Sequence, residues 1–188
     1  MAVSFRLAQH LSEQERNKIL KLLKAADHEF IPPLSARTGT TQQDLEHAAA
    51  NADGVAAYFS QMSQQTFILA EQRRSVCGFL SFIPDYHLTA GDLDLQCDYI
   101  STVIVSPAHR SKGITTGMYQ TLFRTFPAHI LATRTWSTNT AHLHILKMLG
   151  FRLALTLRND RGNNIDTVYY VKGDSHEEAL CLAAAESV

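Results

Sequence analysis

A short basic loop carries the residues whose types and spacing point most directly to chemistry. Arg110, Lys112 and Gly113 lie within four residues of one another, with His109 beside them. Apolar residues recur at helical spacing after the glycine, so the loop leads directly into a helix N-terminus. Unpaired backbone N–H groups, the positive end of the helix dipole and two cations meet there, and the glycine lets a ligand approach the backbone. The pattern predicts a diphosphate site, although a solvated basic turn would carry the same residues.

The elements on either side of this loop must position it. Tyr99–Val105 is short, rich in β-branched residues and followed by Pro107, which is typical of a strand buried on both faces in the middle of a sheet. On the other side of the loop, Ile114, Met118 and Leu122 form the apolar stripe of a helix. The basic loop therefore connects a central strand to a helix that packs on the sheet.

Composition limits the class of protein. The chain has 188 residues, 45% of them apolar, and a formal net charge of −1. One substantial core is therefore expected, without the basic face that a nucleic-acid or membrane-surface protein needs. Three widely spaced cysteines, and a first segment without a basic stretch or a long apolar run, predict neither disulfides nor secretion. We expect a cytoplasmic protein that recognises a small ligand and has no nucleic-acid or membrane partner.

The amino-terminal half begins with a strand over Val3–Ala8 and a helix from about Glu13 to Ala26, which a Ser-x-x-Glu capping box precedes. Two prolines make 30–39 a stiff loop. Its Arg37 is a candidate substrate-binding residue, although a plain connector is an equally good interpretation. The next predicted segments are an interrupted helix over about 41–62, strands over 66–71 and 75–83, and a loop over 84–95.

The carboxy-terminal half alternates strands and a helix. Strands are predicted over 129–136, 151–158 and 165–172, and a helix between Asn139 as its N-cap and Gly150. Strict alternation in the strand 151–158 would point Phe151, Leu153, Leu155 and Leu157 to one side.

Two motifs of the chain resemble those of the GNAT superfamily of N-acetyltransferases. Val105-Ser106-Pro107 followed by Arg110-Ser111-Lys112-Gly113-Ile114-Thr115 is similar to the family's acyl-CoA motif, Arg/Gln-x-x-Gly-x-Gly/Ala after a Val-x-Pro strand end. Thr115 stands where the family has a small residue. The later motif, an Asn, a helix and Leu-Gly-Phe, is matched by Asn139 and Leu149-Gly150-Phe151. Both motifs stand in the family's order, and the resemblance covers about residues 98–152.

The resemblance implies an α/β (α+β) fold. Its mixed, mostly antiparallel central sheet would have about seven strands flanked by helices, and the parallel strands at Tyr99 and His129 would splay apart. A single acyl-CoA N-acyltransferase domain would span 1–172, followed by a tail over 173–188 that could form a short helix.

The resemblance also implies acetyl-CoA as cosubstrate. Backbone groups of Val103 and Val105 would contact the pantetheine arm, and the loop amides would bind the diphosphate. The cofactor-binding residues implied are Val103, Val105, Arg110, Ser111, Lys112, Gly113, Ile114, Thr115 and Asn139.

The catalytic residues are harder to assign. In many relatives a tyrosine on the later helix donates a proton to the departing thiolate, and the matching residue here is Leu146, which cannot. His142, one turn earlier on the same face, could replace it, or could be an ordinary half-buried or capping histidine. Candidates for assisting removal of the amine's proton are Asp98, Tyr99 and Ser101 on the central strand.

Substrate recognition has two further candidates. Arg134 and Trp136 share a face of the strand 129–136 and would suit a substrate with a carboxylate or an apolar ring. A surface salt bridge and a core aromatic are the alternative. His142 and His144 face different ways on their helix, so no metal site is predicted.

Three functions remain open at this point. The leading hypothesis is an acetyl-CoA-dependent N-acetyltransferase that acts on a small-molecule amine by direct attack in a ternary complex. The second is acetylation of a protein N-terminus or lysine, and the third is a CoA-binding regulatory module without catalysis. The oligomeric state stays open, with a homodimer as one option.

Overall fold

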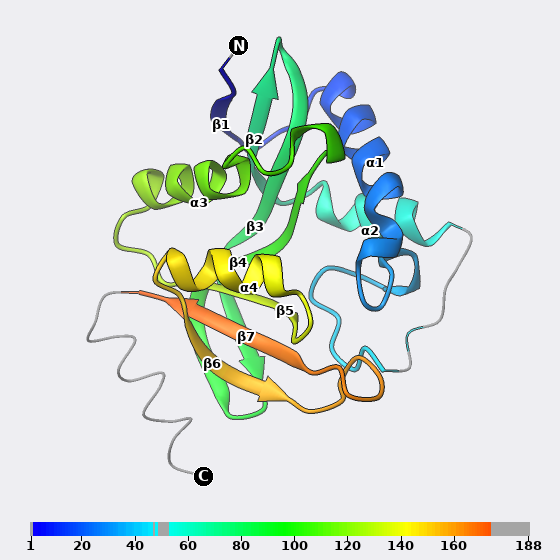
Figure 1. The fold of residues 1–188 in the computed structure, drawn as a ribbon, viewed down its shortest axis with the longest axis vertical. Helices are drawn as coiled ribbons and strands as arrows, with labels where there is room; N and C mark the ends of the chain where they lie inside the picture. The colour runs from blue at the N-terminus through cyan, green and yellow to red at the C-terminus, as the bar shows by residue number, and fades with distance from the viewer. Residues whose placement is uncertain (1, 47, 49–52, 174–188) are drawn as a thin grey trace. The chain divides into compact units, whose positions relative to one another are not determined.

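The computed structural model describes residues 2–46, 48 and 53–173 (Figure 1). Its helices and strands follow in the order β1 (Ser4–Ala8), α1 (Glu13–Ala26), α2 (Gly54–Met62), β2 (Thr66–Gln72), β3 (Ser75–Ala90), β4 (Leu93–Val105), α3 (Ile114–Thr125), β5 (Leu131–Trp136), α4 (Thr140–Met148), β6 (Arg152–Leu157) and β7 (Thr167–Lys172). Three short 3-10 helices are η1 (Asp27–Glu29), η2 (Leu34–Ala36) and η3 (Pro107–His109).

The strands form one seven-stranded sheet in the order β1-β2-β3-β4-β5-β7-β6. The pairs β1–β2, β2–β3, β5–β7 and β6–β7 are antiparallel, whereas β4 and β5 are parallel. A mixed, mostly antiparallel sheet with one parallel pair is the predicted fold class, which is thereby confirmed. None of the described helices is long and apolar enough to cross a membrane.

The chain divides into two compact units. Unit 1 consists of Met1–Phe82 and Ser101–Thr125, and unit 2 consists of Ile83–Ile100 and Phe126–Val188. Strands β3 and β4 each contribute residues to both units. The core of unit 1 contains residues of α1, α2, β2 and β3, and that of unit 2 residues of β3 to β7. The prediction of one domain over 1–172 stays a prediction.

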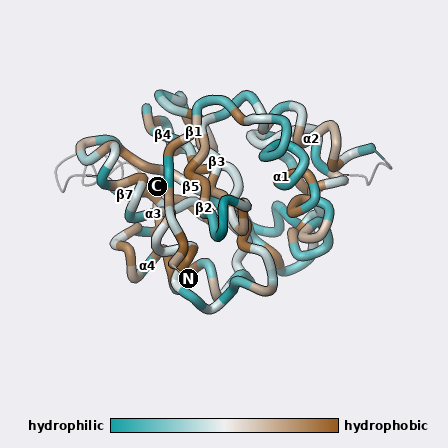
Figure 2. Tube along the Cα trace, turned by 90° about the horizontal axis from the view of Figure 1, so that it is seen from above, coloured by the Kyte–Doolittle hydropathy of each residue, from teal (hydrophilic) through white to brown (hydrophobic). Residues whose placement is uncertain are grey.

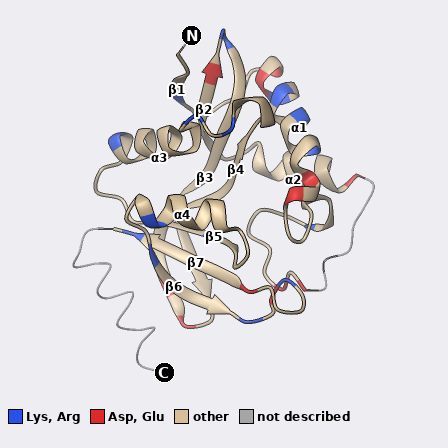
Figure 3. Cartoon of the chain, in the orientation of Figure 1, with Lys and Arg blue, Asp and Glu red and all other residues tan. Residues whose placement is uncertain are grey.

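Helix α1 in unit 1 has the predicted bounds, because its start and its buried face are both encoded locally. Glu15 N–H donates to the Ser12 hydroxyl and Ser12 N–H donates to the Glu15 carboxylate, which completes the capping box. Only a stripe that includes Ile19 and Leu23 is buried, and the helix is mostly hydrophilic in Figure 2. Acidic residues at its start and basic residues further along complement the helix dipole (Figure 3).

The proline-containing loop after α1 is fastened at several points. Buried Asp27 accepts hydrogen bonds from the Ser35 N–H at 2.7 Å and the Ser35 hydroxyl at 2.9 Å. Gly54, at the start of α2, lies so close that an added Cβ would stand 1.9 Å from the Ser35 carbonyl oxygen. Segment 27–37 therefore has a defined conformation within unit 1.

Unit 2 contains a hairpin that the sequence analysis misassigned to a loop over 84–95. Strand β3 continues to Ala90, and a tight turn at Gly91 leads directly into β4. The error came from giving Pro84 and the acidic residues too much weight. Tyr86, Leu88 and Ala90 alternate with exposed residues, and this period of two was the signal for a strand.

Two other predictions need correction. Residues 41–46 are not helical, since Asp44 has a φ of 55° and the Gln42 side chain accepts a hydrogen bond from Thr38 N–H instead. In β6, a register shift between Leu153 and Leu155 interrupts the alternation, so that Leu153 is 48% exposed while Leu155 packs on the core. The predicted tail helix lies outside the described residues.

Candidate functional site

The basic loop and the first turn of α3 present an open backbone surface in unit 1. Within the described part of the chain, the N–H groups of residues 111–116 donate to no acceptor, and the first helical bond runs from Gly117 to Gly113 at 2.9 Å. Ser111 and Gly113 have φ values of 58° and 71°. A Cβ added at Gly113 would meet nothing within 4 Å. A row of aligned donors beside open space at a helix N-terminus is suited to a phosphate or diphosphate.

The cations of this loop differ in their contacts. Arg110 donates from Nε to the Val105 carbonyl at 3.1 Å and from Nη2 to both carboxylate oxygens of Glu29. Lys112 donates to the Ala108 carbonyl at 2.8 Å. The Arg110 guanidinium therefore fixes the turn from the strand to the loop. The Lys112 side chain is exposed, and its ammonium bends back to the loop's own backbone.

His109 is also part of the loop's own structure. Its Nδ1 lies 2.7 Å from the Ser106 hydroxyl and its Nε2 lies 3.2 Å from Gln72 Oε1. Both ring nitrogens are thus engaged with neutral partners, which assigns His109 a role in holding the loop against β2.

The part of β4 that leads to this loop has one buried and one partly open face. Ser101 and Val103 are half-buried, whereas Thr102 and Ile104 are buried. The Thr102 hydroxyl lies 2.7 Å from the hydroxyl of Tyr58 on α2. The alternation leaves Ser101 and Val103 accessible along the strand that precedes the basic loop.

The parallel pairing of β4 with β5 is short. It runs from the pair Asp98–Leu131 to the pair Ile100–Thr133. At this last pair, the Thr133 hydroxyl donates to the Ile100 carbonyl at 3.0 Å. Strand β5 continues to Trp136 and remains paired with β7 along its whole length. The parallel pairing thus covers three residues of each strand.

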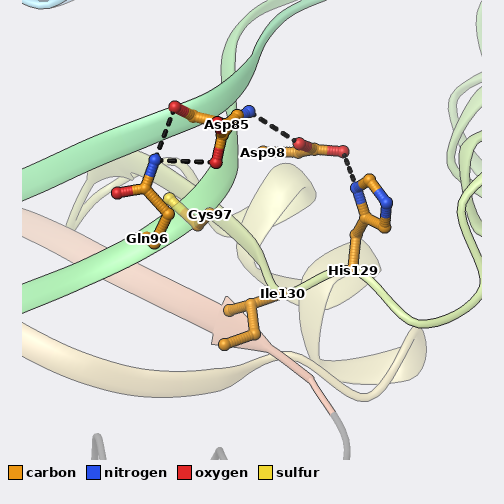
Figure 4. Close-up of a pocket in the computed structure, with 6 residues that line it drawn as sticks. All are labelled: Asp85, Gln96, Cys97, Asp98, His129 and Ile130. Atoms are coloured by element: carbon orange, nitrogen blue, oxygen red, sulfur yellow. Dashed lines mark hydrogen bonds and ion pairs between the residues drawn. The ribbon is translucent and has the colours of Figure 1, made fainter.

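Asp98 is a buried carboxylate paired with a half-exposed histidine, a contact that the sequence analysis did not find. Its side chain is 3% exposed and lies 2.8 Å from Nδ1 of His129, whose own side chain is 50% exposed. The second carboxylate oxygen accepts the Asp85 N–H at 3.0 Å. These residues, with Gln96, Cys97 and Ile130, line an open pocket of about 220 Å³ in unit 2 (Figure 4).

The imidazole of His129 is one of the groups that line the pocket. Because Nδ1 is directed at Asp98, the remaining ring nitrogen of His129 points away from the carboxylate (Figure 4). Tyr99, the neighbour of Asp98 on β4, is instead buried at 2% exposure and packs on Tyr86 with ring centroids 5.2 Å apart. The two catalytic candidates therefore have different surroundings, since adjacent strand residues point to opposite faces.

Helix α4 holds three further predicted positions. Asn139 is its N-cap, since Oδ1 accepts from His142 N–H and Nδ2 donates to the Thr135 hydroxyl at 3.0 Å. Burial lowers the pKa of the His142 imidazole to about 4. Leu146 is fully buried. The lowered pKa makes the neutral imidazole the prevailing form at pH 7, which does not favour His142 as an acid.

The three residues predicted to bind the substrate make contacts within the protein. Arg134 donates to the Tyr169 hydroxyl at 3.3 Å, and Trp136 lies under the guanidinium of Arg161 at 5.8 Å. Arg37 is buried, donates to the Pro32 carbonyl at 2.9 Å and packs against the Phe30 ring. A substrate role for these residues stays a prediction.

Comparison with known proteins decides the family. The sequence model of the acetyltransferase (GNAT) family matches residues 26–151. The chain belongs to the GNAT acetyltransferase family. No curated protein matches the sequence of this GNAT chain.

Solved GNAT structures share its fold. An N-acetyltransferase from Staphylococcus aureus Mu50 has a TM-score of 0.62 and 18% identity, covering 92% of this chain and 99% of its own. YncA from Salmonella typhimurium, solved with its cofactor acetyl-CoA, has a TM-score of 0.61 and 18% identity, covering 92% and 94%. The ribosomal-protein-alanine N-acetyltransferase from Brucella melitensis has a TM-score of 0.61 and 17% identity, covering 90% and 98%.

The residues of the GNAT-like acyl-CoA motif lie at the start of α3, and their role in binding a cofactor stays a prediction. The N–H groups of Ser111, Lys112, Gly113, Ile114 and Thr115 all belong to the open row at the start of α3. No three His, Cys, Asp or Glu side chains in the described ranges are placed to bind a metal ion.

Proposed function

We propose that this GNAT chain transfers an acetyl group from acetyl-CoA to a primary amine of a small molecule, by direct attack in a ternary complex. The observation that carries the proposal is the row of unpaired amides at residues 111–116, which faces open space at Gly113. Oxygens of a diphosphate would accept these N–H groups, and the helix dipole would favour their charge. The residues present therefore fit the diphosphate of a CoA thioester.

The predicted binding residues have distinct parts in this arrangement. The amides of Ser111 to Thr115 would hold the diphosphate, and the Lys112 ammonium would add positive charge. Arg110 would hold the loop through its Nε contact with the Val105 carbonyl, while its Nη2, which contacts Glu29, would be drawn to the diphosphate. Val103 and Val105 would direct the acyl-carrying arm along β4. Asn139 would contribute by capping α4, to which its side chain is bonded.

When bound, acetyl-CoA supplies an acetyl group activated as a thioester. The neutral amine nitrogen forms a bond to the carbonyl carbon, and the carbon–sulfur bond breaks. The nitrogen loses one proton and the thiolate can take up one, so the reaction is balanced. Leu146 cannot donate that proton, and His142 is almost entirely neutral at pH 7. Since thiols have a pKa near 8.5, the thiolate is a good leaving group and can be protonated by water.

We infer a small acceptor because segment 27–37, which contacts the basic loop through Glu29 and Arg110, is held in place at several points. Asp27, Ser35 and Arg37 make hydrogen bonds that close this segment upon itself. A peptide N-terminus is the second candidate, supported by the name of the Brucella neighbour. The two kinds of acceptor can be distinguished, because the rate of peptide acetylation would depend on the first residues of the peptide.

The proposal is tested with the Gly113→Asp variant. A side chain at this position would enter the diphosphate space, and its carboxylate would repel the phosphates. Gly162→Asp is a matched control, because Gly162 also has positive φ and open space around its Cα but lies in the loop between β6 and β7. Both substitutions place a side chain at positive φ, 71° at Gly113 and 106° at Gly162, so the control carries at least as much backbone strain as the test variant.

We expect Gly113→Asp to weaken CoA binding in calorimetry by at least about tenfold, which corresponds to about 1.4 kcal/mol. Gly162→Asp should bind CoA like the parent. Release of thiol from acetyl-CoA in the presence of a panel of amines and peptides then identifies the acceptor class. Equal CoA binding by Gly113→Asp and the parent would contradict the cofactor assignment. CoA binding without turnover on any acceptor would favour a regulatory module.

A further inference from the structure

Four neutral side chains form a continuous hydrogen-bond network inside unit 1. Gln65 Nε2 donates to the Thr40 hydroxyl at 2.8 Å, and the Ser101 hydroxyl donates to Gln65 Oε1 at 2.6 Å. The hydroxyls of Ser81 and Ser101 lie 2.9 Å apart. Thr40, Gln65 and Ser81 are buried, with at most 8% of each residue exposed, whereas Ser101 is half-buried. The network thus connects a buried interior to the accessible face of β4.

The Ser101 hydroxyl acts as donor in one contact of this hydrogen-bond network and as acceptor in another. The Ser101 hydroxyl lies 2.6 Å from Gln65 Oε1 and 3.4 Å from the Ser81 carbonyl oxygen. Because the nearer acceptor, Gln65, takes its single hydrogen, Ser81 donates in the contact between the two hydroxyls. The Ser101 oxygen has two lone pairs, of which Ser81 occupies one. Its second lone pair is left for a donor that approaches the half-buried side chain.

The position of Ser101 on β4 relates this lone pair to the proposed cofactor site. Strand β4 ends at Val105, where the basic loop follows. Ser101 lies four positions earlier, which is about 13 Å of extended strand. Val103, between them, is half-buried like Ser101, whereas Val105 is buried. An acyl-carrying arm that extends from the diphosphate site along β4 would approach Ser101.

We propose that the Ser101 oxygen accepts a hydrogen bond from an N–H group of the acceptor amine, and that Gln65 is the positioning residue for this contact. This inference rests on the proposed function. Gln65 keeps the hydroxyl hydrogen of Ser101 turned away, so that the oxygen presents its lone pair. The amine then keeps its own lone pair for attack on the thioester carbon. Ser101 takes no proton in this step, and the ligand it selects is a neutral amine with at least one N–H.

At its other end, the hydrogen-bond network connects Ser101 to the loop at residues 38–42 through Gln65 and Thr40. Gln61, in the last turn of α2 and four positions before Gln65, donates to the Thr38 carbonyl at 2.7 Å. Gly39 lies against the same glutamine, since an added Cβ would stand 2.1 Å from Gln61 Oε1. Two glutamines therefore hold the loop, and only Gln65 also contacts β4. A change at Gln65 should disturb the acceptor contact and the loop together.

The test compares steady-state kinetics of five variants with the parent. Ser101→Ala removes the acceptor oxygen, Ser101→Thr keeps a hydroxyl, and Gln65→Leu removes the group that orients it. Thr40→Val removes only the hydrogen bond between Gln65 and the loop at residues 38–42. Gln64→Leu is the matched control, because Gln64 is the exposed neighbour of Gln65. Thermal unfolding of each variant shows which of them fold.

Ser101→Ala and Gln65→Leu should each lower kcat/KM for the amine at least about tenfold, with the KM for acetyl-CoA within about twofold of the parent. Ser101→Thr should retain more activity than Ser101→Ala, Thr40→Val should have a smaller effect than Gln65→Leu, and Gln64→Leu should match the parent. The pH dependence of kcat/KM should follow the amine's own pKa in the parent and in Ser101→Ala alike. A shifted pH profile in Ser101→Ala would show proton transfer through Ser101 and overturn the assigned role.

Failure of this inference and of the proposed function have different signatures. If Gly113→Asp binds CoA like the parent, or the parent acetylates no amine, the proposed function is wrong and the inference with it. If Gly113→Asp loses CoA while Ser101→Ala and Gln65→Leu keep kcat/KM for the amine within twofold, only the inference is wrong.

Discussion

The Glu29 carboxylate accepts hydrogen bonds from Arg110 Nη2 at 2.9 and 2.8 Å, which joins η1 to the start of the basic loop. Both side chains are substantially exposed, at 49% and 42%. The ion pair itself therefore contributes at most about 1 kcal/mol to stability. Its position is more informative, because a bound diphosphate would compete with Glu29 for the same guanidinium.

We predict that Glu29→Gln strengthens CoA binding by about three- to tenfold at low salt, because it removes a negative charge beside the proposed diphosphate site. Arg110→Ala should weaken binding. Isothermal titration with CoA at two salt concentrations measures both effects, and Glu13→Gln, an exposed carboxylate on α1, serves as the control. Weaker binding by Glu29→Gln, as with Arg110→Ala, would show that the pair acts by holding the loop in shape.

The Asp98–His129 pair should be important for the stability of the protein. His129→Ala leaves a carboxylate at 3% exposure with the Asp85 N–H as its remaining hydrogen bond in the pocket. We expect a loss of about 1–3 kcal/mol in the free energy of unfolding, measured with denaturant. His87→Ala is the matched control, since the His87–Asp94 pair is exposed on both sides at 61% and 70% and should contribute far less. Equal effects of the two substitutions would contradict a special role for the Asp98–His129 pair.

A feature of this structure can be predicted from the sequence when the residues that determine it lie close together along the chain. Helix α1 was predicted within its observed bounds because Ser12 and Glu15 cap it and the apolar stripe lies within the same 14 residues. The open turn at Gly113 was predicted for the same reason, since a strand end, a glycine and a helix start are contiguous. Local patterns of this kind need no knowledge of the rest of the fold.

The contacts that determine the roles of the candidate residues are long-range. Arg110 contacts Glu29, which is 81 residues away, and Asp98 contacts His129, which is 31 residues away. Neither partner can be chosen without the register of β4 against β5 or the path of segment 27–37. The sequence thus predicts which residues are capable of chemistry, and the fold decides which of them are engaged in holding a loop or a strand.

Gly54 offers a test of whether segment 27–37 is held rigidly. An alanine methyl group there would meet the backbone carbonyl of Ser35, so that helix α2 or η2 must move. Overpacking of this kind costs about 1–3 kcal/mol. We therefore expect Gly54→Ala to lower the denaturation midpoint and to raise the KM of the amine, if the segment borders the acceptor. Unchanged stability would mean that the segment yields easily and does not confine the acceptor.

The final prediction concerns pH and His142. Burial lowers the pKa of this imidazole from 6.5 to about 4, so the unfolded chain binds more protons than the folded one between these values. The stability that depends on neutral His142 is therefore fully present above pH 6.5 and is lost as the pH falls toward 4, by at most about 3 kcal/mol. Replacing it by glutamine should remove this part of the acid destabilisation. Denaturant unfolding of the parent and His142→Gln at pH 7, 6, 5 and 4 measures the difference, with exposed His10→Gln as the control. Parallel stability curves for the parent and His142→Gln would show that the imidazole is hydrated and can be protonated in the folded state, which would return it to consideration as the acid for the thiolate.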